Sequence, residues 1–220
     1  MNRVMKIYKV LHEKYGAQGW WPFTNGGYHP NEYDFPKNEA QSFEICLGVI
    51  LTQNTTFTSV VKSLRNLNEM NCLNCKAIKN MPLDTLKSAI KPSGYFNQKA
   101  SYILIFIEFF ESLEGRVPTR AELLAVKGIG PESADSILLY AYKQPEFVVD
   151  AYTKRLLIHV RLIDEKAGYH AIKKFMEDEI KKEVKDRNEL VIFYQEFHAL
   201  IVAHAKLCYS KKPYGIRCFL

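Results

Sequence analysis

Long apolar runs are missing from this sequence of 220 residues. A membrane-spanning helix needs about 20 consecutive apolar residues, whereas the most apolar stretch, residues 102–110, is interrupted by Glu108. The N-terminal segment carries charges throughout and lacks the apolar core of a signal peptide. We therefore expect a cytoplasmic, nucleoid-associated protein that makes no contact with a membrane.

Cysteine is scarce, with five residues at uneven spacing. This set does not fit the paired framework of a secreted, disulfide-rich protein. Cys72 and Cys75 have no second pair of ligands near them, and His198, His204 and Cys208 are interpreted as packing residues of one helix. The sequence therefore predicts no metal site.

Acidic residues do not dominate, because 24 Asp and Glu stand against 30 Lys and Arg, for a net charge of +6. Hydrophobic residues make up 47% of the chain and charged residues 25%, which is typical of a globular protein and excludes a wholly disordered one. The basic excess is compatible with a polyanionic partner such as nucleic acid but does not require one.

Strand-like alternation is nearly absent, and residues 147–149 are the best short candidate. Apolar residues instead recur at helical spacing over most of the chain, as in residues 98–113 and 188–207. Ser42 is predicted to cap the start of a long helix, and residues 16–40 form a loop rich in glycine, proline and aromatic side chains. The pattern predicts an all-α protein of about ten helices.

The turn Gly128-Ile129-Gly130 joins two predicted helices and is the most informative motif. Glycines accept positive φ and let a foreign backbone come close, and Pro131 suits the first position of the following helix. Amides at such a helix start attract an anion, while Ile129 packs the two helices together. We interpret the turn as a helix-hairpin-helix element that grips DNA phosphate without reading base sequence. Tight packing of two helices is the alternative.

A single carboxylate, Asp150, follows the second hairpin helix and comes directly after two valines. It stands at a predicted helix start, where its side chain could serve only as a cap. The functional alternative is a carboxylate held beside the DNA-binding hairpin, where it could act on a substrate.

Together these elements resemble the endonuclease III-like superfamily of helix-hairpin-helix DNA glycosylases, from about Phe43 to the C-terminus. The segments that carry the resemblance are Leu51-Thr52-Gln53-Asn54-Thr55, Gly94-Tyr95-Phe96-Asn97-Gln98-Lys99-Ala100, Lys127-Gly128-Ile129-Gly130 and Val149-Asp150. The resemblance implies two helical subdomains. A six-helix barrel would span residues 40–147, with the hairpin at 119–143, and a discontinuous subdomain would join residues 1–39 to 148–220.

The same resemblance implies that a damaged nucleotide of double-stranded DNA is flipped out of the stack. Asp150 would stabilise the oxocarbenium-like sugar and help water attack its C1′ atom. Gln53 would fill the gap that the flipped base leaves. The other predicted DNA-binding residues are Lys99, Lys127, Gly128, Ile129 and Gly130.

One departure from the family pattern concerns strand cleavage. Endonuclease III-type members carry a lysine two residues after the second hairpin glycine, and this lysine forms a Schiff base with the sugar. Glu132 occupies that position here, and a carboxylate cannot form a Schiff base. The sequence therefore resembles a monofunctional glycosylase without lyase activity, although Lys127 and Lys99 are candidate substitutes.

A second departure lies near the C-terminus, where some family members hold an iron–sulfur cluster with four cysteines. Here Cys208 and Cys218 match ligand positions, Gly215 stands at the second position, and the sequence ends at Leu220 before a fourth. A four-thiolate cluster needs four such ligands. We expect no cluster and no other cofactor.

A third departure is aromatic: Trp20-Trp21-Pro22 precedes the predicted barrel, and Phe43 opens it. Electron-rich rings bind a cationic alkylated purine well. Together with Glu132, this arrangement is similar to the 3-methyladenine DNA glycosylase branch, in which such rings sandwich the flipped base. Of the two tryptophans, Trp21 is the favoured stacking partner. The alternative is that all three rings only pack the core.

The sequence thus predicts a monomeric, monofunctional glycosylase that removes alkylated bases, above all 3-methyladenine, in base excision repair. An endonuclease III-like glycosylase and lyase for oxidised pyrimidines is one alternative. A catalytically silent DNA-binding protein is the other.

Overall fold

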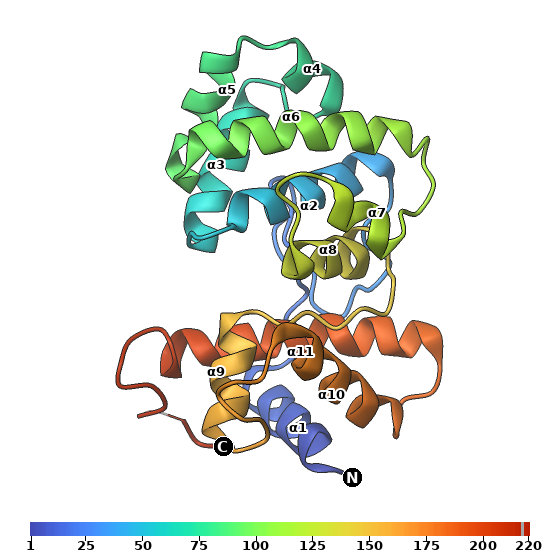
Figure 1. Ribbon diagram of the computed structural model, residues 1–220, viewed down its shortest axis with the longest axis vertical. Coiled ribbons are helices and arrows are strands. Elements are labelled where there is room, and N and C mark those ends of the chain that lie inside the picture. The colour runs from blue at the N-terminus through green and yellow to red at the C-terminus, as the bar shows by residue number, and fades with distance from the viewer. Residues whose placement is uncertain (217) are drawn as a thin grey trace. The chain divides into compact units, whose positions relative to one another are not determined.

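The computed structural model describes residues 1–216 and 218–220 and is all-α, which confirms the predicted fold class (Figure 1). No β-strand occurs in these residues, although Phe23 and Gly27 form an isolated bridge. No helix in the described part of the chain is long and apolar enough to span a membrane. The α-helices are α1 (Arg3–Tyr15), α2 (Glu39–Thr52), α3 (Phe57–Glu69), α4 (Cys75–Asn80), α5 (Leu83–Ile90), α6 (Phe96–Ser112), α7 (Arg120–Ala125), α8 (Pro131–Ser136), α9 (Ala151–His159), α10 (Tyr169–Lys181) and α11 (Arg187–Cys208). A 3₁₀ turn, η1 (Lys91–Ser93), follows α5, and a π-helical turn, η2 (Ile137–Ala141), follows α8.

Helix α2 begins earlier than the sequence predicted, so the expectation that Ser42 caps it was wrong. Asn38 is the N-cap, and its side chain accepts a hydrogen bond from the amide of Gln41 at 3.0 Å. A short side-chain carbonyl is as good a cap as a serine hydroxyl. Ser42 lies inside the helix, and its hydroxyl donates to the carbonyl of Ala141 at 3.2 Å.

The chain divides into two compact units. Unit 1 comprises Met1–Trp20, Tyr28–Tyr33 and Lys143–Leu220. In this unit α1 and α9 pack against α11, and α10 packs against α1 (Figure 1). Tyr194 and Phe197 of α11 are buried, and both contact the ring of Phe147 edge-on. The core of unit 1 therefore surrounds α11.

Unit 2 comprises Trp21–Gly27 and Asp34–Tyr142. Its centre is α2, in which every residue from Phe43 to Leu51 is buried. A helix segment that is buried on all sides is apolar all round, and in this stretch Glu44 is the one charged exception. Helices α3 and α6 and the turn η2 pack against it.

The compact units differ from the predicted division at residues 21–27 and 34–39, which belong to unit 2, and at residues 143–147, which belong to unit 1. Residues 21–27 lie in unit 2 because the Trp21 ring packs against Phe57 and Tyr140 with centroid distances of 5.6 and 5.5 Å. The Thr24 amide also donates to the Glu44 carboxylate of α2 at 2.6 Å. Side-chain packing thus assigns residues 21–27 to unit 2, whereas Trp20 and Tyr28 belong to unit 1.

Candidate active site

Asp150 is the N-cap of α9. Its Oδ1 atom accepts a hydrogen bond from the amide of Thr153 at 2.7 Å, and its side chain is 16% exposed. The preceding residues Val148 and Val149 are buried. The helix start therefore fixes one carboxylate oxygen and leaves the group in partial contact with solvent.

His198 of α11 is the titratable side chain that lies beside this carboxylate. Its Nε2 atom lies 3.8 Å from Oδ2 of Asp150. Burial lowers the pKa of His198 below its usual 6.5, while the Asp150 carboxylate acts in the opposite direction. A neutral imidazole adds no positive charge beside the Asp150 carboxylate.

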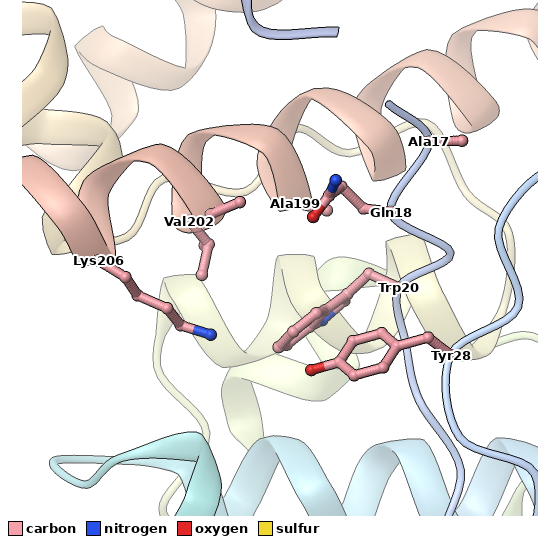
Figure 2. A pocket seen from close by; sticks show the side chains of 8 residues that line it. Ala17, Gln18, Trp20, Tyr28, Ala199, Val202 and Lys206 are labelled. Carbon is pink, nitrogen blue, oxygen red and sulfur yellow. The ribbon is translucent and has the colours of Figure 1, made fainter. Parts of the chain in front are cut away.

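Trp20 lines a cavity of about 190 Å³ in unit 1 (Figure 2). Its ring lies 5.8 Å from that of Tyr28, and the ammonium of Lys206 lies 5.6 Å from the Trp20 ring centroid. Much of the Lys206 side chain is exposed, yet desolvation of its ammonium lowers its pKa. Figure 2 shows the two rings and the amine directed to the same space. The cavity thus offers aromatic faces and one amine.

Glu196, which the sequence analysis missed, positions the backbone leading to Trp20. It is 2% exposed and accepts hydrogen bonds from the amides of Gln18 at 2.9 Å and Gly19 at 3.2 Å. Burying a carboxylate is costly unless donors compensate it. A glutamate on the apolar face of α11 was the available signal.

Trp21 and Phe43 are buried, whereas Trp20 lines a cavity. Trp21 is 5% exposed and lies so close to Gly48 of α2 that a Cβ there would approach its indole at 3.0 Å. Phe43 is 2% exposed and packs against Phe110 with a centroid distance of 5.3 Å. Both rings belong to the core of unit 2, and their predicted base-stacking role stays a prediction.

The hairpin between α7 and α8 uses its two glycines differently. Gly128 has φ +94, and a Cβ there would meet the ring of Tyr102 at 2.4 Å. Gly130 has φ −92, and a Cβ there would meet nothing within 4 Å. The expectation of positive φ therefore applies to Gly128 alone. Ile129 is buried, as expected of the residue that packs the two helices together.

Gln53, the predicted wedge, is the C-cap of α2 and connects this helix to the hairpin. Its Nε2 atom donates to the carbonyl of Gly128 at 2.9 Å and to the hydroxyl of Ser133 at 3.1 Å. The structure therefore brings two of the predicted DNA-binding elements together within unit 2.

A buried ion pair, also missed from the sequence, fixes the two hairpin helices. Arg120 of α7 donates from Nε and Nη2 to the two carboxylate oxygens of Asp135 of α8, at 2.7 and 3.2 Å. The Asp135 side chain is fully buried, and that of Arg120 is 27% exposed. A bidentate pair of this kind fixes geometry as well as charge.

Removing one partner of this pair should destabilise the protein strongly. We expect Arg120→Met to lower the free energy of unfolding by about 3 kcal/mol, because it leaves the buried Asp135 carboxylate without its cation. Urea unfolding measures the change. The double variant Arg120→Met/Asp135→Leu should recover much of the loss, and a double variant less stable than the single one would contradict this account.

The remaining predicted DNA-binding and pocket residues lie in contrasting places. Lys127 is exposed beside the hairpin turn, and Glu132 is exposed in the first turn of α8. Lys99 is only 2% exposed, and its Nζ donates to the carbonyls of Leu51 at 2.7 Å and Ser93 at 2.8 Å. Two backbone carbonyls thus bind the Lys99 ammonium inside unit 2, and its predicted contact with DNA stays a prediction.

The C-terminal thiols of Cys208 and Cys218 contact side chains of unit 1. The Cys218 sulfur accepts a hydrogen bond from the Tyr209 hydroxyl at 2.9 Å and lies 3.4 Å from Nε2 of His204. Gly215, at the position of a second ligand, packs so closely on His159 that a Cβ would meet its ring at 2.3 Å. In the described residues no group of three or more His, Cys, Asp or Glu side chains could hold a metal ion.

Comparison with known proteins connects these elements to one family. The sequence matches the HhH-GPD superfamily of base excision DNA repair proteins over residues 47–182. It is 37% identical to a protein of Methanocaldococcus jannaschii named as a DNA repair glycosylase, over 98% of this chain and 92% of that protein. It is 27% identical to endonuclease III of Sulfolobus acidocaldarius, over 86% of this chain and 88% of the relative.

Solved structures agree with the family match. The 3-methyladenine DNA glycosylase of H. pylori, solved with 1,N6-ethenoadenine, is 31% identical and superposes with a TM-score of 0.74, over 93% of this chain and 97% of that one. An endonuclease III–DNA complex, 19% identical, shares the fold with a TM-score of 0.72. The chain therefore belongs to the HhH-GPD superfamily of base excision DNA repair proteins, as a DNA glycosylase.

Proposed function

We propose that this protein is a monofunctional DNA glycosylase that excises alkylated bases, with 3-methyladenine as its main substrate. The observation that carries the proposal is the aromatic cavity formed by Trp20 and Tyr28 in the unit that also contains Asp150. The likeness to the H. pylori enzyme supports the same substrate class. No cofactor takes part in the proposed reaction.

The cavity supports this substrate class through its chemistry. At about 190 Å³ it is smaller than the pockets of about 300 Å³ or more that hold drug-sized ligands, and is thus suited to a fragment such as a single base. A cationic alkylpurine gains from an electron-rich ring face without needing many hydrogen bonds. The Lys206 amine lies 5.6 Å from the Trp20 ring centroid, so a cationic base stacked on this ring would take the place of another cation.

Asp150 is the proposed catalytic residue. When the bond between C1′ and the base breaks, its electron pair leaves with the base, and a positive charge develops on the sugar. The Asp150 carboxylate would stabilise this charge and accept a proton from the water whose oxygen bonds to C1′. A cationic alkylpurine leaves as a neutral base, so the reaction needs no strong acid at the leaving group.

The position of Lys99 supports the absence of lyase activity. Burial lowers its pKa to about 8, which would favour a nucleophilic amine. However, two backbone carbonyls hold its Nζ inside unit 2, where a sugar cannot reach it. Glu132 occupies the place of the lysine that forms a Schiff base in endonuclease III-type members.

An endonuclease III-like glycosylase and lyase is the second candidate function. Several relatives are endonucleases III, including that of Sulfolobus acidocaldarius. The exposed amine of Lys127, beside the hairpin turn, is the feature that favours this candidate. It would require that this amine reach C1′ and form a covalent intermediate.

Substitutions of the two adjacent tryptophans should have different effects on activity and stability. We expect Trp20→Ala to reduce excision of 3-methyladenine at least tenfold while changing the free energy of unfolding by no more than about 1 kcal/mol, because Trp20 lines a cavity. Trp21→Ala should cost about 3–5 kcal/mol of stability, because its ring fills the core of unit 2. Thermal unfolding and base-release assays on both variants measure the difference. Equal stability losses would contradict it.

Chromatography with mass spectrometry of released bases tests the proposed substrate class. Methylated genomic DNA incubated with the protein should yield 3-methyladenine as the main product, and oxidised DNA should yield little. Release of oxidised pyrimidines alone would favour the second candidate function. Failure to release any base from either DNA would contradict the proposal.

A further inference from the structure

Among the described residues of unit 2, Lys99 of α6 is the most deeply buried lysine, with 2% of its surface exposed. Its Nζ atom lies 2.7 Å from the carbonyl oxygen of Leu51 and 2.8 Å from that of Ser93. These acceptors are 48 and 6 residues away in sequence. One amine therefore joins the last turn of α2 to the end of η1.

Each acceptor carbonyl lies two or three residues before a non-glycine residue with left-handed backbone. Leu51 is in the last turn of α2 and precedes Asn54, which has φ +54. Ser93 ends η1 and precedes Tyr95, which has φ +46 and is 65% exposed. Non-glycine residues adopt this conformation uncommonly, although Asn does so more readily than most. The Lys99 amine bonds to the backbone just before each of these residues.

Gln53 extends this connection to a third segment, the hairpin between α7 and α8. It follows Leu51 by two residues, and its side chain donates to Gly128 and Ser133 of the hairpin. The direction of this side chain depends on where the end of α2 lies, and the Leu51 carbonyl is part of that end. A shift of about 1 Å in such an anchor is enough to disturb a placed functional group.

We propose that Lys99 is a positioning residue that joins the end of α2 to the turn at residues 93–95 and thereby sets the direction of the Gln53 side chain. This role replaces direct contact of Lys99 with DNA phosphate. The proposal rests on the proposed function to the extent that Gln53 acts when a damaged base leaves the duplex. The connection itself is a property of the free protein.

The hydrogen bonds from Lys99 to the carbonyls of Leu51 and Ser93 should persist at high pH. Burial lowers the pKa of Lys99 from its ordinary 10.5 to about 8, and a neutral amine still has two N–H donors for its two carbonyl partners. Between about pH 8 and 10.5 the unfolded chain binds one more proton at this residue than the folded chain, so stability rises with pH in this window. Relative to Lys99→Met, the parent protein should therefore gain stability as pH rises from 7 to 10.

Hydrogen exchange of the free protein tests the connection without any activity assay. In Lys99→Met, amides at residues 53–55 and 94–96 should exchange faster than in the parent. Lys91→Met is the matched control, since Lys91 is exposed in the same region and its loss removes charge alone. In Lys99→Arg, which keeps a donor group, the exchange rates of these amides should lie between those of the parent and those of Lys99→Met. Unchanged exchange in Lys99→Met, or equal acceleration in Lys91→Met, would overturn the proposal.

A pair of DNA substrates tests the functional consequence. One duplex carries the alkylated base in a pair, and the other carries it in a single-nucleotide bulge, where it is already unstacked. We expect Lys99→Met to lower kcat/KM about tenfold on the paired base and much less on the bulged one, because only the paired base needs help to leave the stack. Equal loss on both substrates would overturn the positioning role. If the parent excises no alkylated base, the proposed function fails, while the exchange experiment still decides the connection.

Discussion

Replacing Asp150 with asparagine should abolish excision of 3-methyladenine and leave the fold intact. Asparagine caps a helix as well as aspartate does, so the bond from the Thr153 amide should survive and the free energy of unfolding should change by no more than about 0.5 kcal/mol. The variant lacks the negative charge that opposes the developing cation and the base that accepts a proton. We therefore expect kcat to fall about 10³-fold or more, as measured in single-turnover base release.

Asp150→Ala is the matched control because it removes the cap as well as the charge. It should lose the same activity and, in addition, about 1 kcal/mol of stability. His198 provides an internal check, since its pKa should fall further in Asp150→Asn once the carboxylate is gone. An Asp150→Asn protein that retains activity would show that this carboxylate only caps α9.

Substitution of the two hairpin glycines should give opposite phenotypes. Gly130→Ala should fold normally, because its φ of −92 suits alanine and its Cβ would meet nothing within 4 Å. If this open side of the turn receives a DNA phosphate, the added methyl group obstructs the backbone contact. We expect DNA affinity to fall about tenfold regardless of sequence, with a salt dependence weaker by about one phosphate. Fluorescence anisotropy over a salt series measures both.

Gly128→Ala should instead destabilise the protein. Its φ of +94 strains any L side chain, and its Cβ would meet the Tyr102 ring at 2.4 Å. A loss of about 2 kcal/mol or more follows from strain and overpacking together. If Gly130→Ala proves as unstable as Gly128→Ala, the exposed side of the turn is a packing surface and not a phosphate site.

Several site elements could be predicted because their chemistry is local in sequence. A glycine turn before a proline-started helix predicts the hairpin, and the structure places it between α7 and α8. The valines before Asp150 predict a buried approach to a helix start, and Asp150 is the N-cap of α9. Helical periodicity predicts the all-α class, because helices such as α1 and α3 bury one apolar face, while α2 buries every residue from Phe43 to Leu51.

Other features depend on contacts between distant residues, which no local pattern encodes. The Arg120–Asp135 pair and the bonds from Gln18 and Gly19 to Glu196 exist only after the helices pack. The same holds for Lys99, whose sequence context matched a family motif but whose burial depends on the ends of α2 and η1. Basic charge alone therefore did not indicate that this lysine is buried.

Borohydride trapping on DNA tests most directly whether the reaction uses a carboxylate and no amine. The protein would be incubated with a duplex that contains one abasic site and with one that contains an alkylated adenine, each with reductant present. We predict base release from the second duplex, an intact sugar-phosphate strand until alkali is added, and no covalent protein–DNA adduct with either duplex. A trapped adduct, above all one lost in Lys127→Met, would contradict the account and assign the chemistry to a Schiff base.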